Sequence, residues 1–187
     1  MFSESGNDKD DIKQILEIQK ECQLSAWTFE DYKQELEKDF SLILVAKSDQ
    51  KIIGFLASRL LMKSQSERDE ENIADIYSEA EILNFGVIKS YRKQAVGSLL
   101  FNKFLQNVQC LSIKTIWLDV RISNLRAINF YSNRGFIKVE KRKNFYNLPA
   151  EDAIVMKLNT ADADEFRKRT KLDSIRDFEI TSLRNPK

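Results

Sequence analysis

One segment of the sequence limits the possible folds more than any other. The stretch from Glu79 to Val120 reads as an apolar strand (79–87), a short basic turn, an amphipathic helix (96–108) and a second apolar strand (115–120). Two strands that are joined through a helix pair in parallel in most folds. The apolar residues that fit one side of this helix are Val96, Leu99, Leu100, Phe104 and Val108. The segment therefore predicts a locally parallel strand pair with a helix packed on the sheet.

The other strands follow one another without a helix between them. Residues 41–47 and 51–62 read as strands around a polar turn, which predicts an antiparallel hairpin. Residues 137–143 and 153–158 read as a second such pair near the end of the chain. We therefore expect an α+β fold, with a mixed and mainly antiparallel central sheet and helices on its faces.

Three further helices complete the pattern of expected elements. Apolar residues in 11–22 roughly fit one helical face, and Thr28 opens a second helix with acidic residues in its first turn. Residues 124–134 form a helix that Gly135 ends.

The expected domain organisation is simple. Residues 10–158 form one domain, preceded by a disordered segment (1–9) and followed by a charged tail (159–187) that can form a further helix. Residues 63–78 are highly charged, lack an apolar period and are expected to form a loop inserted between strands.

Composition excludes several classes of function. Lys and Arg number 30 against 29 Asp and Glu, so the chain lacks the basic bias of a general nucleic-acid binder. No apolar run is long enough for a membrane span, and the N-terminus is polar and acidic, so we expect a cytoplasmic protein without membrane contact. The absence of histidine excludes a Ser-His-Asp triad, a Cys-His pair and a His-ligated metal site, and no metal is expected.

The turn after the strand that ends at Val87 has the character of a phosphate site. It reads Arg92-Lys93-Gln94-Ala95-Val96-Gly97 and leads into a helix, whose free N–H groups and dipole favour an anion. It lacks the Gly-Lys-Ser/Thr ending of a P-loop and the Gly-x-Gly-x-x-Gly of a dinucleotide site. Taken alone, the turn is equally compatible with a basic helix N-terminus that binds nothing.

At this turn the sequence resembles the GNAT acetyltransferase family. The phosphate-loop motif of that family, Arg/Gln-x-x-Gly-x-Gly/Ala, is matched by Arg92 and Gly97, with Ala95 in place of the first glycine. Alanine is a departure from the pattern, because it tolerates a positive φ poorly and narrows the approach to the backbone.

A second segment, Thr115 to Phe136, resembles the RimI branch of that family, the ribosomal-protein-alanine N-acetyltransferases. The matching residues are Trp117, Leu118, Val120, Arg121, Ser123, Asn124, Ala127, Ile128, Tyr131, Gly135 and Phe136. The match continues through Arg142 to Tyr146, and the resemblance covers roughly residues 10–158. It implies the three-layer αβα GNAT fold and transfer of an acetyl group from acetyl-CoA.

The resemblance also implies an acceptor and a set of partners. The RimI branch suggests a protein N-terminal α-amine, namely the N-terminal alanine of a small-subunit ribosomal protein, with no direct nucleic-acid binding. Two alternatives stay open from the sequence. One is an acetyltransferase for lysine or for a broader set of acceptors, and the other is a GNAT module that binds CoA without catalysis.

Site residues follow from the same resemblance. Tyr131 is expected to be the general acid near the leaving sulfur. Asp119 stands where the RimI pattern has glutamate, and its shorter side chain suggests that it acts as a base through water. Glu79 and Glu81 are alternative bases, which strand alternation places on one face. The residues expected to bind the coenzyme are Phe85, Gly86, Val87, Arg92, Lys93, Gln94, Ala95, Val96, Gly97, Ser98, Asn124 and Tyr131.

Three aromatic residues have two equally supported interpretations. Trp27, Phe145 and Tyr146 either line a groove for the acceptor peptide or simply pack.

Overall fold

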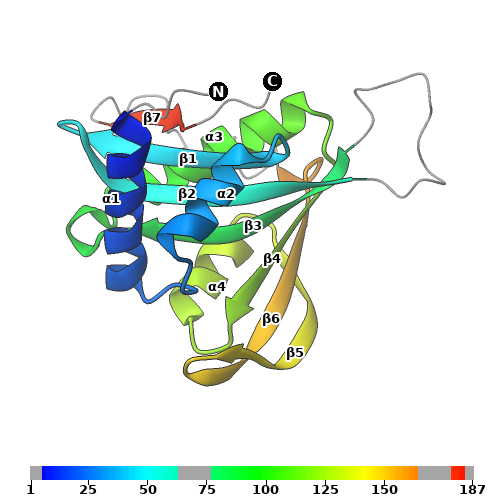
Figure 1. The fold of residues 1–187 in the computed structure, drawn as a ribbon. Coiled ribbons are helices and arrows are strands. Elements are labelled where there is room, and N and C mark those ends of the chain that lie inside the picture. Colours follow the sequence, from blue (N-terminus) through cyan, green and yellow to red (C-terminus); the bar gives the residue numbers. More distant parts are fainter. Residues whose placement is uncertain (1–5, 63–76, 164–177, 184–187) are drawn as a thin grey trace. The chain divides into compact units, whose positions relative to one another are not determined.

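The computed structural model describes residues 6–62, 77–163 and 178–183 of the chain. These residues divide into two compact units, the first drawn from 6–59, 84–104 and 178–183 and the second from 60–62, 77–83 and 105–163. The elements, labelled in Figure 1, are α1 (Gly6–Cys22), α2 (Phe29–Glu37), β1 (Ser41–Ser48), β2 (Lys51–Met62), β3 (Tyr77–Val87), the short 3₁₀ helix η3 (Lys89–Tyr91), α3 (Val96–Cys110), β4 (Thr115–Arg121), α4 (Leu125–Ser132), β5 (Ile137–Asn147), β6 (Ala150–Asn159) and β7 (Glu179–Ser182).

The strands form a mixed sheet in the order β5-β6-β4-β3-β2-β1-β7. β1 pairs antiparallel with β2 and with β7, and β6 pairs antiparallel with β4 and with β5. The pair β3–β4, which flanks α3 in the sequence, is parallel. The predicted α+β class, with a mixed and mainly antiparallel sheet, is confirmed.

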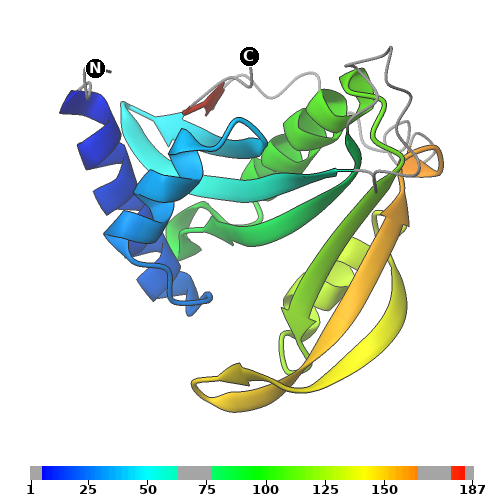
Figure 2. The same ribbon diagram turned by 45° about the vertical axis from the view of Figure 1, so that its right-hand side comes forward.

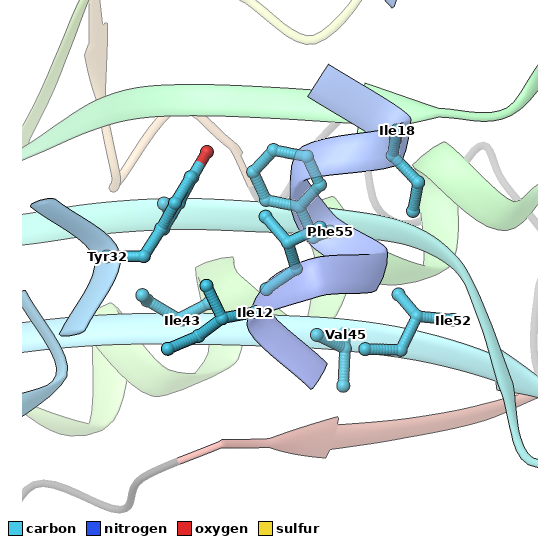
Figure 3. Packing of buried hydrophobic residues seen from close by; sticks show 9 residues of the cluster. Ile12, Ile18, Tyr32, Ile43, Val45, Ile52 and Phe55 are labelled. Atoms are coloured by element: carbon cyan, nitrogen blue, oxygen red, sulfur yellow. The ribbon is translucent and has the colours of Figure 1, made fainter. Parts of the chain in front are cut away.

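The core of the first unit lies between α1, α2 and one face of β1 and β2. α1 contributes Ile12, Ile15 and Ile18, spaced three residues apart, and all three are buried. Figure 3 shows that Ile12 and Ile18 of α1 and Tyr32 of α2 lie over side chains of the two strands. The buried strand residues of this cluster are Ile43, Val45, Ile52, Phe55 and Ala57.

A local sequence signal fixes the start of α2. The Thr28 hydroxyl accepts a hydrogen bond from the Asp31 N–H at 3.2 Å, and the Asp31 carboxylate accepts one from the Thr28 N–H at 2.7 Å. This reciprocal pair is a capping box. The rings of Trp27 and Tyr32 pack across it, with centroids 5.0 Å apart. The prediction that Thr28 opens a helix is confirmed.

Two glycines let helices approach both faces of the sheet in the first unit. A Cβ atom on Gly54 of β2 would lie 3.2 Å from Cδ1 of Leu100 in α3. A Cβ atom on Gly86 of β3 would lie 3.0 Å from Cδ1 of Leu24 and 3.2 Å from Cγ2 of Ile18 in α1. The sheet therefore lies between α3 and the pair α1–α2, as Figures 1 and 2 also show.

In the second unit, α4 lies along one face of β4 and β6 (Figure 2). Side chains of β4 alternate between buried and half-buried along the whole strand. The buried ones are Ile116, Leu118 and Val120, and the half-buried ones project from the other face. Gly135 follows α4 with a φ of 90°, which glycine adopts without strain, so the predicted end of this helix is confirmed.

Several element bounds differ from the sequence prediction. α1 begins at Gly6, within the segment expected to be disordered, because its polar first turn carries no apolar signal. β5 continues through Asn147, beyond the predicted strand end at residue 143, so Phe145 and Tyr146 lie in the strand. The tail contains β7, a strand paired with β1 that the sequence pattern did not predict, and its paired backbone covers the edge of β1. Residues 164–177, and the expected loop up to residue 76, lie outside the described residues.

Candidate active site

The turn between η3 and α3 has an unusual backbone. Lys93 and Ala95 both have positive φ, 61° and 63°. Within the described part of the chain, no main-chain N–H group from Lys93 to Gly97 donates a hydrogen bond. Alternating left-handed residues directed into a helix start form a concave surface of N–H groups, which suits an anion. The backbone thus has the property expected of a phosphate loop.

Side-chain hydrogen bonds connect this loop to the end of β3 and to α1. The Arg92 guanidinium donates from Nε to the Val87 carbonyl at 2.9 Å and from Nη2 to the Cys22 sulfur at 3.2 Å. The Lys89 N–H donates to the Glu21 carboxylate at 2.6 Å. Arg92 therefore ties the end of β3 to the last residue of α1, whereas Lys93 is exposed. Of the two basic residues expected at the rim, only Lys93 has an exposed side chain.

The other residues expected at the coenzyme lie on either side of this loop. Phe85 and Val87 are half-buried near the end of β3, with buried Gly86 between them against α1. Gln94 is exposed, and its side-chain amide donates to the Ser90 carbonyl at 2.8 Å. Val96 is buried at the start of α3, followed by half-buried Gly97 and Ser98.

In the second unit, α4 carries Asn124 and Tyr131. Asn124 is the N-cap, and its side-chain oxygen accepts from the Ala127 N–H at 3.1 Å. Tyr131 is only 6% exposed and packs against the rings of Phe130 and Phe136, at centroid distances of 5.4 and 5.2 Å. Burial raises the pKa of the Tyr131 phenol well above its ordinary value. The hydroxyl is therefore neutral at ordinary pH and is chemically able to donate a proton.

The three candidate bases lie on one face of the sheet in the second unit. Glu79 and Glu81 of β3 pair with Thr115 and Trp117 of β4, and Asp119 follows Trp117 by two residues. Paired residues and residues two apart in a strand share a face. All three carboxylates are half-buried. The structure thus brings together the residues that the sequence placed on two separate strands.

Asp119 differs from the two glutamates in its surroundings. Its Oδ2 accepts from Nη1 of Arg142 at 2.8 Å, while its Oδ1 is buried and has no hydrogen-bond partner among the described residues. Burial and the nearby Glu140 raise the pKa of the Asp119 carboxyl, and Arg142 opposes them; the net shift is upward. A half-desolvated carboxylate with one unoccupied oxygen is suited to accept a proton.

Comparison with known proteins identifies the family of the chain. The model of the acetyltransferase (GNAT) family matches residues 12–136. The chain belongs to the GNAT acetyltransferase family. It is an N-acetyltransferase of this family, as the sequence motifs predicted.

Relatives and solved structures agree with this assignment. The chain is 28% identical over 149 residues to the [ribosomal protein bS18]-alanine N-acetyltransferase of Haemophilus influenzae, covering 78% of this chain and 90% of that protein. The ribosomal-protein-S18-alanine N-acetyltransferase from Escherichia coli has a similar fold, with a TM-score of 0.66 at 23% identity over 81% of this chain and 88% of that chain. Arabidopsis thaliana Naa50, solved with the bisubstrate analogue CoA-Ac-MVNAL, has a TM-score of 0.65 at 23% identity, over 80% of this chain and 93% of that one.

No helix in the described residues is long and apolar enough to span a membrane.

Sequence reasoning gave no role to two residues of this GNAT chain that contact or influence Asp119. The sequence indicates Arg142 only as a motif match, and it leaves Tyr146 as either a groove residue or a packing residue. Burial and the charge of Asp119 raise the pKa of Tyr146 to about 12. The Arg121 guanidinium lies 4.1 Å from the centroid of the Tyr146 ring and donates to Glu151 at 3.2 Å. These contacts depend on the β5–β6 register, which the sequence pattern does not reveal.

Proposed function

We propose that the protein transfers the acetyl group of acetyl-CoA to the N-terminal α-amine of a protein, with the N-terminal alanine of a small-subunit ribosomal protein as acceptor. The observation that carries the proposal is the row of unoccupied N–H groups from Lys93 to Gly97. Such a loop binds anions, and a phosphate or pyrophosphate is an anion of this kind. The similarity to the Haemophilus influenzae enzyme supports the choice of acceptor.

In this proposal the loop binds the pyrophosphate of the coenzyme. The amides of Lys93 to Gly97 donate to its oxygens, the Lys93 ammonium adds charge, and Arg92 acts by holding the loop. The remaining residues assigned to the coenzyme are expected to bind the pantetheine arm and the acetyl oxygen, with main-chain N–H groups as donors. These residues are Phe85, Gly86, Val87, Ser98 and Asn124.

The chemistry requires removal of two protons from the amine and donation of one proton to the leaving group. The ammonium loses one proton before the free amine attacks the thioester carbon. The nitrogen of the tetrahedral intermediate then loses its second proton to solvent, the C–S bond breaks and the thiolate leaves. We assign proton removal to Asp119 through a water molecule, because its Oδ1 has no hydrogen-bond partner among the described residues and can therefore accept one. Glu79 and Glu81 are alternative bases on the same face. Tyr131 protonates the departing thiolate, and burial keeps its phenol protonated until that step.

Two departures from the family pattern favour one rival, a module that binds CoA without catalysis. Ala95 replaces a glycine of the phosphate loop, and Asp119 replaces the glutamate of the RimI pattern. The rival predicts that acetyl-CoA binds but is not consumed in the presence of any acceptor.

The test follows free thiol release from acetyl-CoA with three peptides. The first has the N-terminus of a small-subunit ribosomal protein with alanine first, the second is the same peptide with a blocked N-terminus, and the third has a blocked N-terminus and an internal lysine. We expect turnover with the first peptide only. Turnover with the third peptide and none with the first would contradict the α-amine assignment. Coenzyme binding without turnover would support the non-catalytic module.

A further inference from the structure

Arg142 reaches Asp119 across a neighbouring strand. Asp119 of β4 pairs with Val155 of β6, and Arg142 of β5 pairs with Ala153 of the same strand. Both β6 residues are buried and apolar. The Arg142 guanidinium therefore crosses over small apolar side chains to meet Asp119 Oδ2 at 2.8 Å. Its aliphatic part lies on the same sheet face as Asp119.

The ion pair makes the two oxygens of Asp119 unequal. Oδ2 is held by the guanidinium, and the side chain of Asp119 is only 13% exposed. Oδ1 is buried, and it has no hydrogen-bond partner in the part of the chain that is described. A fixed guanidinium restricts rotation of the short carboxyl group. One oxygen is thereby engaged in the ion pair, and the other keeps its capacity to accept a hydrogen bond or a proton.

We propose that Arg142 is a positioning residue, which keeps Asp119 ionised and leaves Oδ1 as the atom that accepts the proton during acetyl transfer. The proposal rests on the proposed function, since it assigns Asp119 as the base. It also explains how aspartate can serve where the RimI pattern has the longer glutamate: the ion pair fixes a carboxylate that would otherwise rotate.

Several other charged or titratable groups lie on the face that Asp119 occupies. From β5 these are Glu140 and Tyr146, and from the β6 side they are Lys157, which lies 5.0 Å from the Trp117 ring, and Glu151. Arg121 of β4 shares the face but is engaged by Glu151 and by the Leu148 and Pro149 carbonyls. Glu81 of β3 lies beside Trp117 of β4. Arg142 is the cation that bonds to Asp119 directly.

The direction in which removal of the Arg142 guanidinium changes the pKa of Asp119 can be predicted. Burial and Glu140 already raise the pKa of Asp119, and Arg142 opposes both. Without Arg142 the pKa rises further, so the base is protonated over a wider range of acidic pH. The acidic limb of the kcat/KM profile therefore moves to higher pH. Arginine beside an aspartate shifts a pKa by roughly 1–3 pH units. Because Arg142 is 46% exposed, we expect about one pH unit, the lower end of that range.

The experiment compares kcat/KM against pH for the wild type, Arg142→Met and Arg142→Lys, with the alanine peptide as acceptor. Lys138→Met is the matched control, because it removes a positive charge from the same strand at a position that pairs with Met156 and so faces the other side. We expect the acidic limb to move up by about one pH unit in Arg142→Met. It should move less in Arg142→Lys and not at all in Lys138→Met. A uniform loss at every pH, or an equal shift in the control, would overturn the proposal.

A second readout separates this inference from the proposed function. Carbon-detected NMR titration of the Asp119 carboxyl group reports its protonation directly, whether or not the protein turns over any peptide. The inference predicts a higher midpoint in Arg142→Met than in the wild type, with unchanged affinity for acetyl-CoA by calorimetry. Equal midpoints would refute the role of Arg142 even if acetyl transfer is established. A higher midpoint without any turnover would mean that the proposed function is wrong while the ion pair acts as described.

Discussion

Replacing Ala95 by glycine should stabilise the protein. Ala95 has a φ of 63°, where an L-residue costs about 1–2 kcal/mol relative to the right-handed region. Glycine removes that cost, but it also increases the entropy of the unfolded chain, which offsets about 0.4–1 kcal/mol. The net expectation for Ala95→Gly is a gain of about 0.5–1 kcal/mol in the free energy of unfolding. In a chain of 187 residues this corresponds to a rise in Tm of roughly 1–4 °C.

The same substitution should strengthen coenzyme binding. It removes a methyl group from the loop whose N–H groups are proposed to contact the pyrophosphate, so the phosphate can approach more closely. Thermal unfolding measures the first effect, and calorimetric titration with acetyl-CoA measures the second.

A matched control separates backbone strain from a general effect of glycine. Ala161 is exposed in a turn and does not have a positive φ. Ala161→Gly should therefore lower stability by about 0.4–1 kcal/mol, with no change in coenzyme affinity. If both glycine variants lose stability by the same amount, the strain argument for Ala95 is refuted.

Three further substitutions test other parts of the account. Tyr131→Phe keeps the packed ring but removes the proton donor, so we expect kcat to fall by roughly 10²–10⁴-fold with acetyl-CoA affinity retained, as steady-state kinetics and calorimetry can check. Glu35→Gln weakens the pair that the buried Glu35 side chain makes with Arg59 at 2.6 Å and should cost about 1.5–3 kcal/mol in urea unfolding at neutral pH. Burial opposes ionisation of Glu35, but hydrogen bonds from Arg59 and Lys38 and the charge of Arg59 together outweigh it and lower the pKa, so the cost should shrink as the pH falls below about 4. Gly54→Ala would place a Cβ atom 3.0 Å from the Gly86 carbonyl oxygen and should lower stability by about 1–3 kcal/mol.

Local signals explain why much of the fold was predictable. The capping box at Thr28 and Asp31 and the stop at Gly135 each depend on a few neighbouring residues. The parallel pairing of β3 and β4 follows from the helix between them. The first two features involve short sequence separations, and the third depends only on the order of the elements along the chain, which the residue pattern also shows.

Features that depend on long-range register were not predictable in the same way. The Arg142–Asp119 pair joins residues 23 positions apart across β6, and β5 carries two register irregularities that alter which side chains share a face. Likewise, β7 is four residues long, and its pairing depends on the edge that β1 offers. No local pattern of apolar residues encodes either contact.

For the candidate site, too, the sequence predicted some features and not others. Family motifs located Tyr131, Asp119 and the loop after β3 from the sequence. Motifs did not reveal that the Arg92 side chain turns back to Val87 and Cys22, because that contact joins the loop to the end of α1. The structure therefore supplies the environment of each residue, whereas its assigned role in catalysis comes from the resemblance and stays a proposal.

The most direct test of the account is to locate the transferred acetyl group. The purified protein is incubated with isotopically labelled acetyl-CoA and an alanine-first ribosomal peptide that also contains a lysine, and the product is sequenced by tandem mass spectrometry. The account predicts label on the α-amine of the first residue and none on the lysine side chain. Label on lysine alone, or an unmodified peptide together with intact acetyl-CoA, would contradict it.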